Sequence, residues 1–286
     1  MLKTRIITAL VILPVVFIAL FSFPNWAWDL FTLAITLVAC WEWSRFCRLS
    51  RSSASVFFIV SLAGSAVVFF AYLGMTPLTF ATVALVGFIA SALFWLMVAP
   101  VWLAKTWRPE GSIGTWVVAF TGWVVIFPTW FAFLMLHDLG PWMLLSFALI
   151  VWVADIAAYF VGKSVGKRKL APSISPGKTI EGAAGGLIGV GVYFFVWQQL
   201  VGSAAARGED WARELSSHGW LLFGMFMLLG VVSIVGDLFE SWMKRGVGMK
   251  DSSSLLPDHG GILDRIDALT STLPLAGLYL LVMQKL

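Results

Sequence analysis

The sequence predicts an all-α, polytopic integral membrane protein with about nine transmembrane helices. Hydrophobic residues make up 60% of its 286 residues, and only 12% are charged, whereas a soluble domain carries about 25% charged residues. Apolar runs of about 20 residues, the length that crosses a bilayer as a helix, recur along the whole chain. Lysine and arginine gather in alternate connections between these runs. Together these features exclude a soluble globular fold.

Nine apolar runs are candidate spans. They cover residues 6–23, 26–44, 55–73, 79–103, 115–136, 142–161, 182–201, 219–240 and 268–283. The first run follows basic residues, as a signal peptide would, but no small-x-small cleavage site follows and the second run begins at once. We therefore expect a retained helix. The last run is short and contains Pro274, so we expect it to lean on neighbouring helices.

The positions of the basic residues predict the orientation. With the N-terminus in the cytoplasm, 16 of the 19 Lys and Arg residues fall on the cytoplasmic side, because only Arg207, Arg213 and Lys285 fall outside. A missed helix would scramble this alternation. We predict nine spans, a cytoplasmic N-terminus and an outer C-terminus. We divide the chain into three sections: N-terminal transmembrane helices at 1–110, middle helices with a basic cytoplasmic loop at 111–181, and C-terminal helices that carry the polar loop at 182–286.

Cysteine chemistry is not indicated. Cys40 and Cys47 are the only cysteines, they lie seven residues apart on one expected helix, and no CxxC motif occurs. The pattern predicts neither a zinc site nor a disulfide framework. We also expect no nucleic-acid partner.

The cytoplasmic segment 162–181 contains two sequences, "GKS" and "GKT", that resemble the end of a P-loop. The earlier glycine of that motif is replaced by Ala157 in one case and by Pro172 in the other, and a membrane helix precedes them, so the P-loop interpretation fails. A Gly-Lys-Thr sequence at the start of a helix still suits phosphate. We therefore predict substrate binding by Lys178, Thr179 and Glu181. For Lys163, Lys167, Arg168 and Lys169 a purely topological role is favoured.

Acidic residues within apolar spans are costly to insert and are functional candidates. Asp155, Asp237, Asp264 and Asp267 all lie at the expected cytoplasmic ends of spans, or just before one. Glu240 follows Asp237 by three residues and so shares its helical face. Two further acids, Asp29 and Glu42, lie near the ends of the second span, and we expect them to be interfacial.

The acids and the surrounding bases favour phosphoryl or nucleotidyl transfer. Carboxylates without cysteine are hard oxygen ligands, suited to Mg²⁺ or Mn²⁺ rather than zinc. Acids that hold a metal beside bases that hold phosphate are the combination that this chemistry needs. The alternative is a salt-bridged loop in which each acid neutralises a base. That alternative does not explain the glycines at 246, 248, 260 and 261, whose small size lets backbone approach a ligand.

The polar residues of the C-terminal section resemble a family signature. From Ser241 to Asp267 they follow the order S-x-x-K-R-x4-K-D-x7-H-G-G-x-x-D-R-x-D. This order is similar to the signature of the phosphatidate cytidylyltransferases (CDP-diacylglycerol synthases). The stretches "DIAAYFVGKSVGK" and "SPGKTIEGAAGG" also resemble that family. The likeness extends from about residue 150 onwards, and the N-terminal half matches only as a set of spans.

The resemblance implies that CTP and phosphatidate are converted to CDP-diacylglycerol and pyrophosphate. It implies Mg²⁺, with a second cation as an option, a homodimer, and a bacterial inner-membrane location with the active site facing the cytoplasm. It suggests that the metal is held by Asp237, Asp264 and Asp267. The expected catalytic residues are Lys244, Arg245, Lys250, Asp251, His259 and Arg265. The expected substrate-binding residues are Asp155, Lys178, Thr179, Glu181, Ser241, Gly260 and Gly261.

Other functions remain to be weighed. A CTP-dependent lipid kinase would share the substrates but attack the γ-phosphorus, and it stays an alternative. The D-G-x-x-A-R motif of CDP-alcohol phosphotransferases is absent. A secondary transporter would carry acids near the midplane and two related halves, whereas here the acids crowd one interface in one half. Transport is therefore disfavoured.

Overall fold

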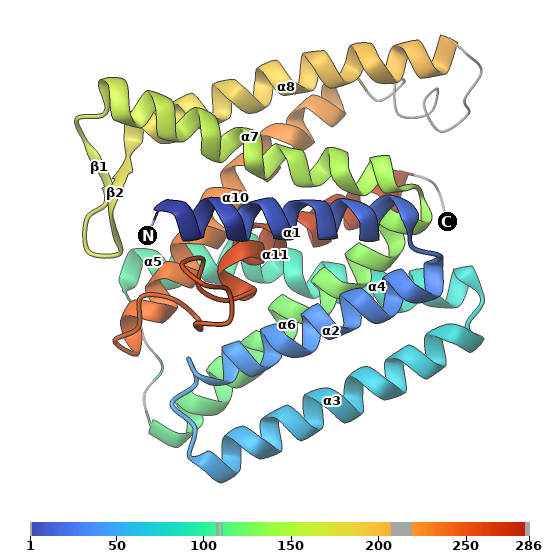
Figure 1. The fold of residues 1–286 in the computed structure, drawn as a ribbon, viewed down its shortest axis with the longest axis vertical. Coiled ribbons are helices and arrows are strands. Elements are labelled where there is room, and N and C mark those ends of the chain that lie inside the picture. Colours follow the sequence, from blue (N-terminus) through green and yellow to red (C-terminus); the bar gives the residue numbers. More distant parts are fainter. Residues whose placement is uncertain (1, 107–108, 110, 207–218, 284–286) are drawn as a thin grey trace.

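Long antiparallel helices make up almost the whole fold (Figure 1). The structure, a computed structural model, describes residues 2–106, 109, 111–206 and 219–283. The helices are α1 (Leu2–Ser22), α2 (Asn25–Ser44), α3 (Arg51–Gly74), α4 (Pro77–Leu93), α5 (Ala99–Lys105), α6 (Gly111–Asp138), α7 (Pro141–Val165), α8 (Ile180–Ala206), α10 (Gly219–Gly246) and α11 (Leu263–Met283). A π-helical turn, η1 (Phe94–Val98), joins α4 to α5 without a break. Two short strands, β1 (Lys169–Ala171) and β2 (Ser175–Thr179), pair antiparallel.

The all-α prediction is confirmed, and each of the nine apolar runs coincides with one helical segment of the described chain. Seven segments of the described residues are long and apolar enough to cross a membrane: 51–74, 77–105, 111–138, 141–165, 180–204, 219–246 and 263–283. The chain is therefore an integral membrane protein. The β1–β2 hairpin was not predicted, because the segment 162–181 reads only as a basic loop.

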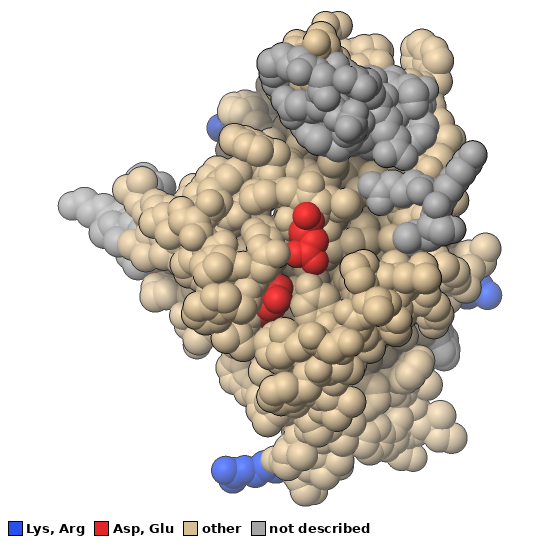
Figure 2. All heavy atoms as spheres, turned by 90° about the vertical axis from the view of Figure 1, so that its right-hand side faces the viewer, with Lys and Arg blue, Asp and Glu red and all other residues tan. Residues whose placement is uncertain are grey.

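The helices alternate in direction between two ends of the molecule (Figure 1). We call the end that carries β1, β2 and the N-terminus the hairpin end, and the other, where α11 finishes, the opposite end. Figure 2 looks onto the opposite end, where Lys and Arg appear only at the margins. This agrees with gathering of basic residues at the hairpin end, although Arg108, Arg207, Arg213 and Lys285 lie outside the described residues. Which end faces the cytoplasm stays a prediction.

Helices α7 and α8 approach each other closely because α8 carries glycines on the shared face. A Cβ atom on Gly182 would lie 2.9 Å from the carbonyl oxygen of Ala158, and one on Gly186 would lie 2.9 Å from that of Ala154. Small residues of this kind let membrane helices pack backbone against backbone. The close packing holds β1 and β2, which connect the two helices, in a defined place at the hairpin end.

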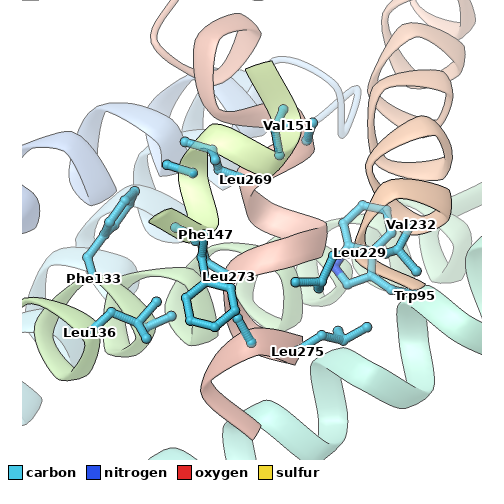
Figure 3. Packing of buried hydrophobic residues seen from close by; sticks show 14 of the residues in the cluster. Trp95, Phe133, Leu136, Phe147, Val151, Leu229, Val232, Leu269, Leu273 and Leu275 are labelled. Carbon is cyan, nitrogen blue, oxygen red and sulfur yellow. The ribbon is translucent and has the colours of Figure 1, made fainter. Parts of the chain in front are cut away.

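Helix α11 runs through the centre of the bundle. Its Leu269 and Leu273 pack near Phe147 of α7, and its Leu275 lies near Trp95 of η1 (Figure 3). Nearly every residue from Ala268 to Leu281 is buried, so the expectation that the short last span leans on its neighbours is confirmed. The acids at the start of α11 are consequently held against several other helices.

Both cysteines are buried and free. Cys47 lies in the turn after α2, and burial raises the pKa of its thiol to about 12. Only the thiolate is a good nucleophile, so the native thiol at this position is inert near neutral pH.

Candidate active site

The segment between α10 and α11, residues 247–262, is here called the signature loop. It has little regular structure: a single bridge joins Leu256 to Gly260 within it. Its path needs left-handed backbone at Asp258 (φ 59°) and Gly260 (φ +79°). Such a loop depends on side chains from neighbouring helices for its shape, because it has few backbone hydrogen bonds of its own.

Asp264, in the first turn of α11, organises the signature loop. Its Oδ2 atom accepts hydrogen bonds from the backbone N–H of Ser252 (2.8 Å), the Ser252 hydroxyl (2.9 Å) and the backbone N–H of Gly261 (2.7 Å). A Cβ atom on Gly260 would collide with this carboxylate, and one on Gly261 would collide with Ser252 and Glu42. In this structure the two glycines therefore make room for carboxylates of the protein, and their expected contact with substrate stays a prediction.

Lys244 joins α10 to α11. Its Nζ atom lies 2.5 Å from Asp264 Oδ1 and 2.5 Å from Glu240 Oε2, and only 11% of its side chain is exposed. A lysine that is buried between two carboxylates has little capacity left for a phosphate. Lys244 is thus placed to hold Asp264, and its expected catalytic role stays a prediction.

Lys178 and Asp237 form a second ion pair at the hairpin end. Lys178 Nζ on β2 contacts Asp237 Oδ2 on α10, and both side chains are partly exposed, at 29% and 28%. Ser241 lies one turn further along α10, with its hydroxyl 3.4 Å from Asp237 Oδ1. The fold therefore brings the Gly-Lys-Thr segment to the acid of α10, as the prediction of one shared site requires.

Asp155 and Asp267 interact electrostatically with this ion pair. The electrostatic neighbours of Asp155 are Asp237 and Lys178. Asp267 is influenced by Asp237, Lys178 and Lys244, and its Oδ1 accepts the backbone N–H of Ala268 at 2.7 Å. We call Asp155, Lys178, Asp237 and Asp267 the acid–lysine cluster. Its members come from α7, β2, α10 and α11, so it exists only in the folded bundle.

Thr179 and Glu181 have local roles at the start of α8. The Thr179 hydroxyl accepts the backbone N–H of Gly182 at 3.1 Å and so caps the helix. The Glu181 carboxylate accepts the backbone N–H groups of Lys167 (3.0 Å) and Arg168 (3.1 Å) and pairs with Arg168 Nε at 3.1 Å. Both side chains brace the hairpin, and their expected contact with substrate stays a prediction.

A cavity of about 410 Å³ opens beside the acid–lysine cluster. It lies between α7, the hairpin and α8, and its wall is mostly apolar. Asp155, Lys163 and Lys178 place charged groups in this wall. An apolar cavity with a few charged groups fits a ligand that has both an apolar body and an ionic head.

Several predicted residues of the signature region are open to solvent. Arg245, Lys250, Asp251 and Arg265 are exposed, and Arg245 Nη1 donates to the carbonyl of Met249 at 3.2 Å. His259 is partly exposed, with Nδ1 3.3 Å from the carbonyl oxygen of Pro257. These side chains are accessible to a polyanion at the hairpin end.

The sequence interpretation missed the part played by α2. Glu42 is fully buried, and its carboxylate accepts hydrogen bonds from the signature loop. Its expected place at the membrane interface stays a prediction. Arg45 Nη1 donates to the Ser252 carbonyl at 2.6 Å, and Arg48 donates to that of Gly246. A signal was present in the sequence, because Glu42 stands between two tryptophans at the end of an apolar run.

The donor types suit a hard divalent cation, although no group of three or more His, Cys, Asp or Glu side chains in the described residues is arranged to hold a metal. Asp237 and Asp264, two of the three predicted ligands, each contact a lysine ammonium group. The protein thus already places a positive charge against each carboxylate. Carboxylate oxygens are the ligands that Mg²⁺ prefers, so the residues fit the ion that the resemblance implies.

The bundle of apolar helices defines an integral membrane protein with a cluster of charged side chains at one end. Its sequence matches the model of the cytidylyltransferase family over residues 3–283. The chain therefore belongs to the cytidylyltransferase family. The match includes the N-terminal half, which the signature alone did not reach.

Named relatives agree with this membership. The chain is 37% identical to a phosphatidate cytidylyltransferase of Pseudomonas aeruginosa over 285 residues, covering 96% of this chain and 95% of the relative. It is 34% identical to one of Haemophilus influenzae over 300 residues, covering 96% of each. One of Brucella suis is 45% identical over 130 residues, covering 46% of this chain and 43% of the relative. The resemblance inferred from the signature is confirmed.

Proposed function

We infer that this chain transfers a cytidylyl group from CTP to phosphatidate, giving CDP-diacylglycerol and pyrophosphate for phospholipid synthesis. The observation that carries this function is the similarity, over 96% of the chain, to two relatives named for that activity. The site agrees chemically, because it combines carboxylates for a cation with exposed bases for phosphates at one end of a membrane bundle.

The reaction needs little proton transfer. A phosphate monoester has a second pKa of about 6, so the phosphatidate phosphate is mostly dianionic near neutral pH and is already a nucleophile. One of its oxygens forms a bond to the α-phosphorus of CTP. The bond from that phosphorus to the oxygen bridging the α- and β-phosphates breaks, and pyrophosphate leaves with the electron pair. The main task of the protein is to bring two polyanions together and to stabilise the leaving group.

The bases divide into two groups by exposure. Arg245, Lys250 and Arg265 are exposed at the hairpin end, and we assign them to the phosphates of CTP and to the leaving pyrophosphate. His259 is placed to orient a phosphate. Lys244, which is buried, keeps Asp264 in position and contributes to the site through that carboxylate.

We propose Asp237, Asp264 and Asp267 as the carboxylates that hold Mg²⁺. When bound, the ion would neutralise phosphate charge and act as a Lewis acid. Lys178 is paired with Asp237. With a cation at that carboxylate, the ammonium group of Lys178 would be available to a phosphate of CTP at the edge of the cavity that it lines.

The cavity beside the acid–lysine cluster suits the lipid substrate. Its apolar wall, formed between α7 and α8, would receive the start of the acyl chains, and Lys163 would meet the phosphate head. The rest of the chains would stay in the bilayer, so phosphatidate could enter sideways between helices. We also propose that the hairpin end faces the cytoplasm, where CTP is found, and that the protein works as a homodimer in the bacterial inner membrane.

Labelled CTP tests the reaction. Purified protein is incubated with phosphatidate, Mg²⁺ and CTP that carries ³²P in either the α- or the γ-phosphate. We expect the α label in lipid and the γ label in pyrophosphate. Lipid that is labelled from the γ position would establish a CTP-dependent lipid kinase instead and would overturn the proposal.

A further inference from the structure

Helices α1 and α2, in the N-terminal part of the chain, donate hydrogen bonds to the signature loop. Thr8 of α1 donates from its hydroxyl to the carbonyl of Pro257 at 3.1 Å, and Arg45 of α2 donates to the carbonyl of Ser252 at 2.6 Å. The loop contains only short turns and one isolated bridge of its own. Its conformation is therefore set to a large extent by these two helices.

Glu42 is the centre of this support. Its Oε1 atom accepts hydrogen bonds from the Ser253 hydroxyl (2.6 Å) and the Ile262 N–H (3.1 Å). Its Oε2 atom accepts them from the Ser252 hydroxyl (3.2 Å) and the Leu263 N–H (2.6 Å). The residue is 0% exposed, so its carboxylate is enclosed by protein. One carboxylate thereby fixes the middle and the end of the signature loop and the first residue of α11.

The same contacts connect Glu42 to the proposed metal carboxylates. The Ser252 hydroxyl lies between Glu42 Oε2 and Asp264 Oδ2, at 3.2 Å and 2.9 Å. Asp264 Oδ1 then contacts Lys244, which also pairs with Glu240. A continuous buried polar chain thus runs from α2 through the loop to α11 and α10. Asp267 follows Asp264 by one helical turn, so a shift at the start of α11 would move both acids.

The surroundings of the Glu42 carboxylate suit a side chain that holds other groups in position rather than one that contacts substrate. An ionised carboxylate can be buried when donors satisfy its oxygens, and donors from the loop reach both oxygens of Glu42. Gly261 has no room for a Cβ atom because Glu42 occupies that space. Glu42 is consequently enclosed by the loop and has no open path to a ligand.

We propose that Glu42 is a positioning residue for cytidylyl transfer: it locks the signature loop and the start of α11, and thereby sets Asp264 and Asp267. The proposal rests on the proposed function for its kinetic readout only. A second readout, amide hydrogen exchange, reports on the loop whether or not the reaction is the one proposed.

The test compares Glu42→Gln with Asp29→Asn in the full-length purified protein. Glutamine keeps the size of the side chain but replaces one acceptor oxygen by an NH₂ group, so the loop donors on that side lose their acceptor. We expect faster exchange at Ser252–Leu263 and unchanged exchange in α6 and α7. With CTP and phosphatidate we expect kcat to fall about 10- to 100-fold, as small displacements of catalytic groups can cause. The KM for CTP should change less than kcat, within about threefold, because Arg245 and Lys178 lie outside the displaced segment.

Asp29 is the matched control, since it is a buried acid on the same helix, at the opposite end. Asp29→Asn should leave loop exchange and kcat unchanged. Should Glu42→Gln fail to fold, Ser253→Ala removes a single donor from Glu42 and should give the same pattern with a smaller loss in kcat. Wild-type exchange and kcat in Glu42→Gln would overturn the proposal. So would faster exchange spread through all helices with a parallel loss for Asp29→Asn, because Glu42 would then be an ordinary core residue.

Discussion

Replacing Lys244 by methionine tests whether this lysine stabilises the fold by pairing with two buried carboxylates, rather than binding phosphate. The side chains of Glu240 and Asp264, its two partners, are each 4% exposed. Removing the ammonium group leaves both carboxylates without their cation. Asp264 keeps donors from Ser252 and Gly261, whereas no other donor among the described residues reaches the oxygens of Glu240. The loss should therefore fall mainly on Glu240.

The expected magnitude follows from that burial. Breaking a buried ion pair by removing one partner costs about 3–5 kcal/mol in the free energy of unfolding. At about 2–4 °C per kcal/mol for a chain of this size class, the unfolding temperature should fall by about 6–20 °C. Thermal unfolding of the purified protein in detergent, scanned at one fixed rate, measures this shift.

A second substitution identifies the cause. Adding Glu240→Gln to Lys244→Met removes the uncompensated charge and should recover at least half of the lost stability. Glu240→Gln alone leaves Lys244 paired with Asp264 and should be milder than Lys244→Met. If Lys244→Met unfolds within about 2 °C of wild type, a loss of less than 1 kcal/mol on this scale, Lys244 does not stabilise the two buried carboxylates as inferred. The same conclusion follows if the double variant recovers none of the lost stability.

Three further predictions concern the metal, the nucleotide and the topology. Asparagine in place of Asp237, Asp264 or Asp267 should lower turnover by orders of magnitude, and high Mg²⁺ should partly restore the activity of at least one of these variants. Near-normal activity at low Mg²⁺ in all three variants would show that the acids are ordinary loop charges. Alanine at Lys178 or Arg245 should raise the KM for CTP. Arg245→Ala should leave the Mg²⁺ dependence of the rate unchanged, and a shifted Mg²⁺ dependence in that variant would argue against phosphate binding by Arg245. Cysteines introduced at positions 109 and 170 should react with cytoplasmic reagents and those at 139 and 210 with periplasmic ones; one site on the wrong side breaks the nine-span topology. Position 210 lies outside the described residues.

Much of the site was visible in the sequence as separate pieces. Asp155, Asp237 and Asp267 stand out because an acid in an apolar run is costly and so needs a reason. Their grouping with Lys178 could be expected, since all lie at span ends on one side. Glu181 and Thr179 were identified as well, but the structure uses them to brace the hairpin and cap α8. The sequence could not separate these uses, because a capping side chain and a ligand-binding side chain have the same chemistry.

The sequence by itself determined the class of protein, the apolar runs that become helices and the family. These follow from local properties, since the thickness of a bilayer sets the length of an apolar run and a signature is a short ordered pattern. Only the tertiary structure decided which carboxylate meets which partner. Glu42 and Ser253 are 211 residues apart, and Lys178 and Asp237 are 59 apart. Such pairings depend on how helices pack, as in the close approach of α7 and α8 at Gly182 and Gly186, and hydropathy along the chain carries no information about which helices become neighbours.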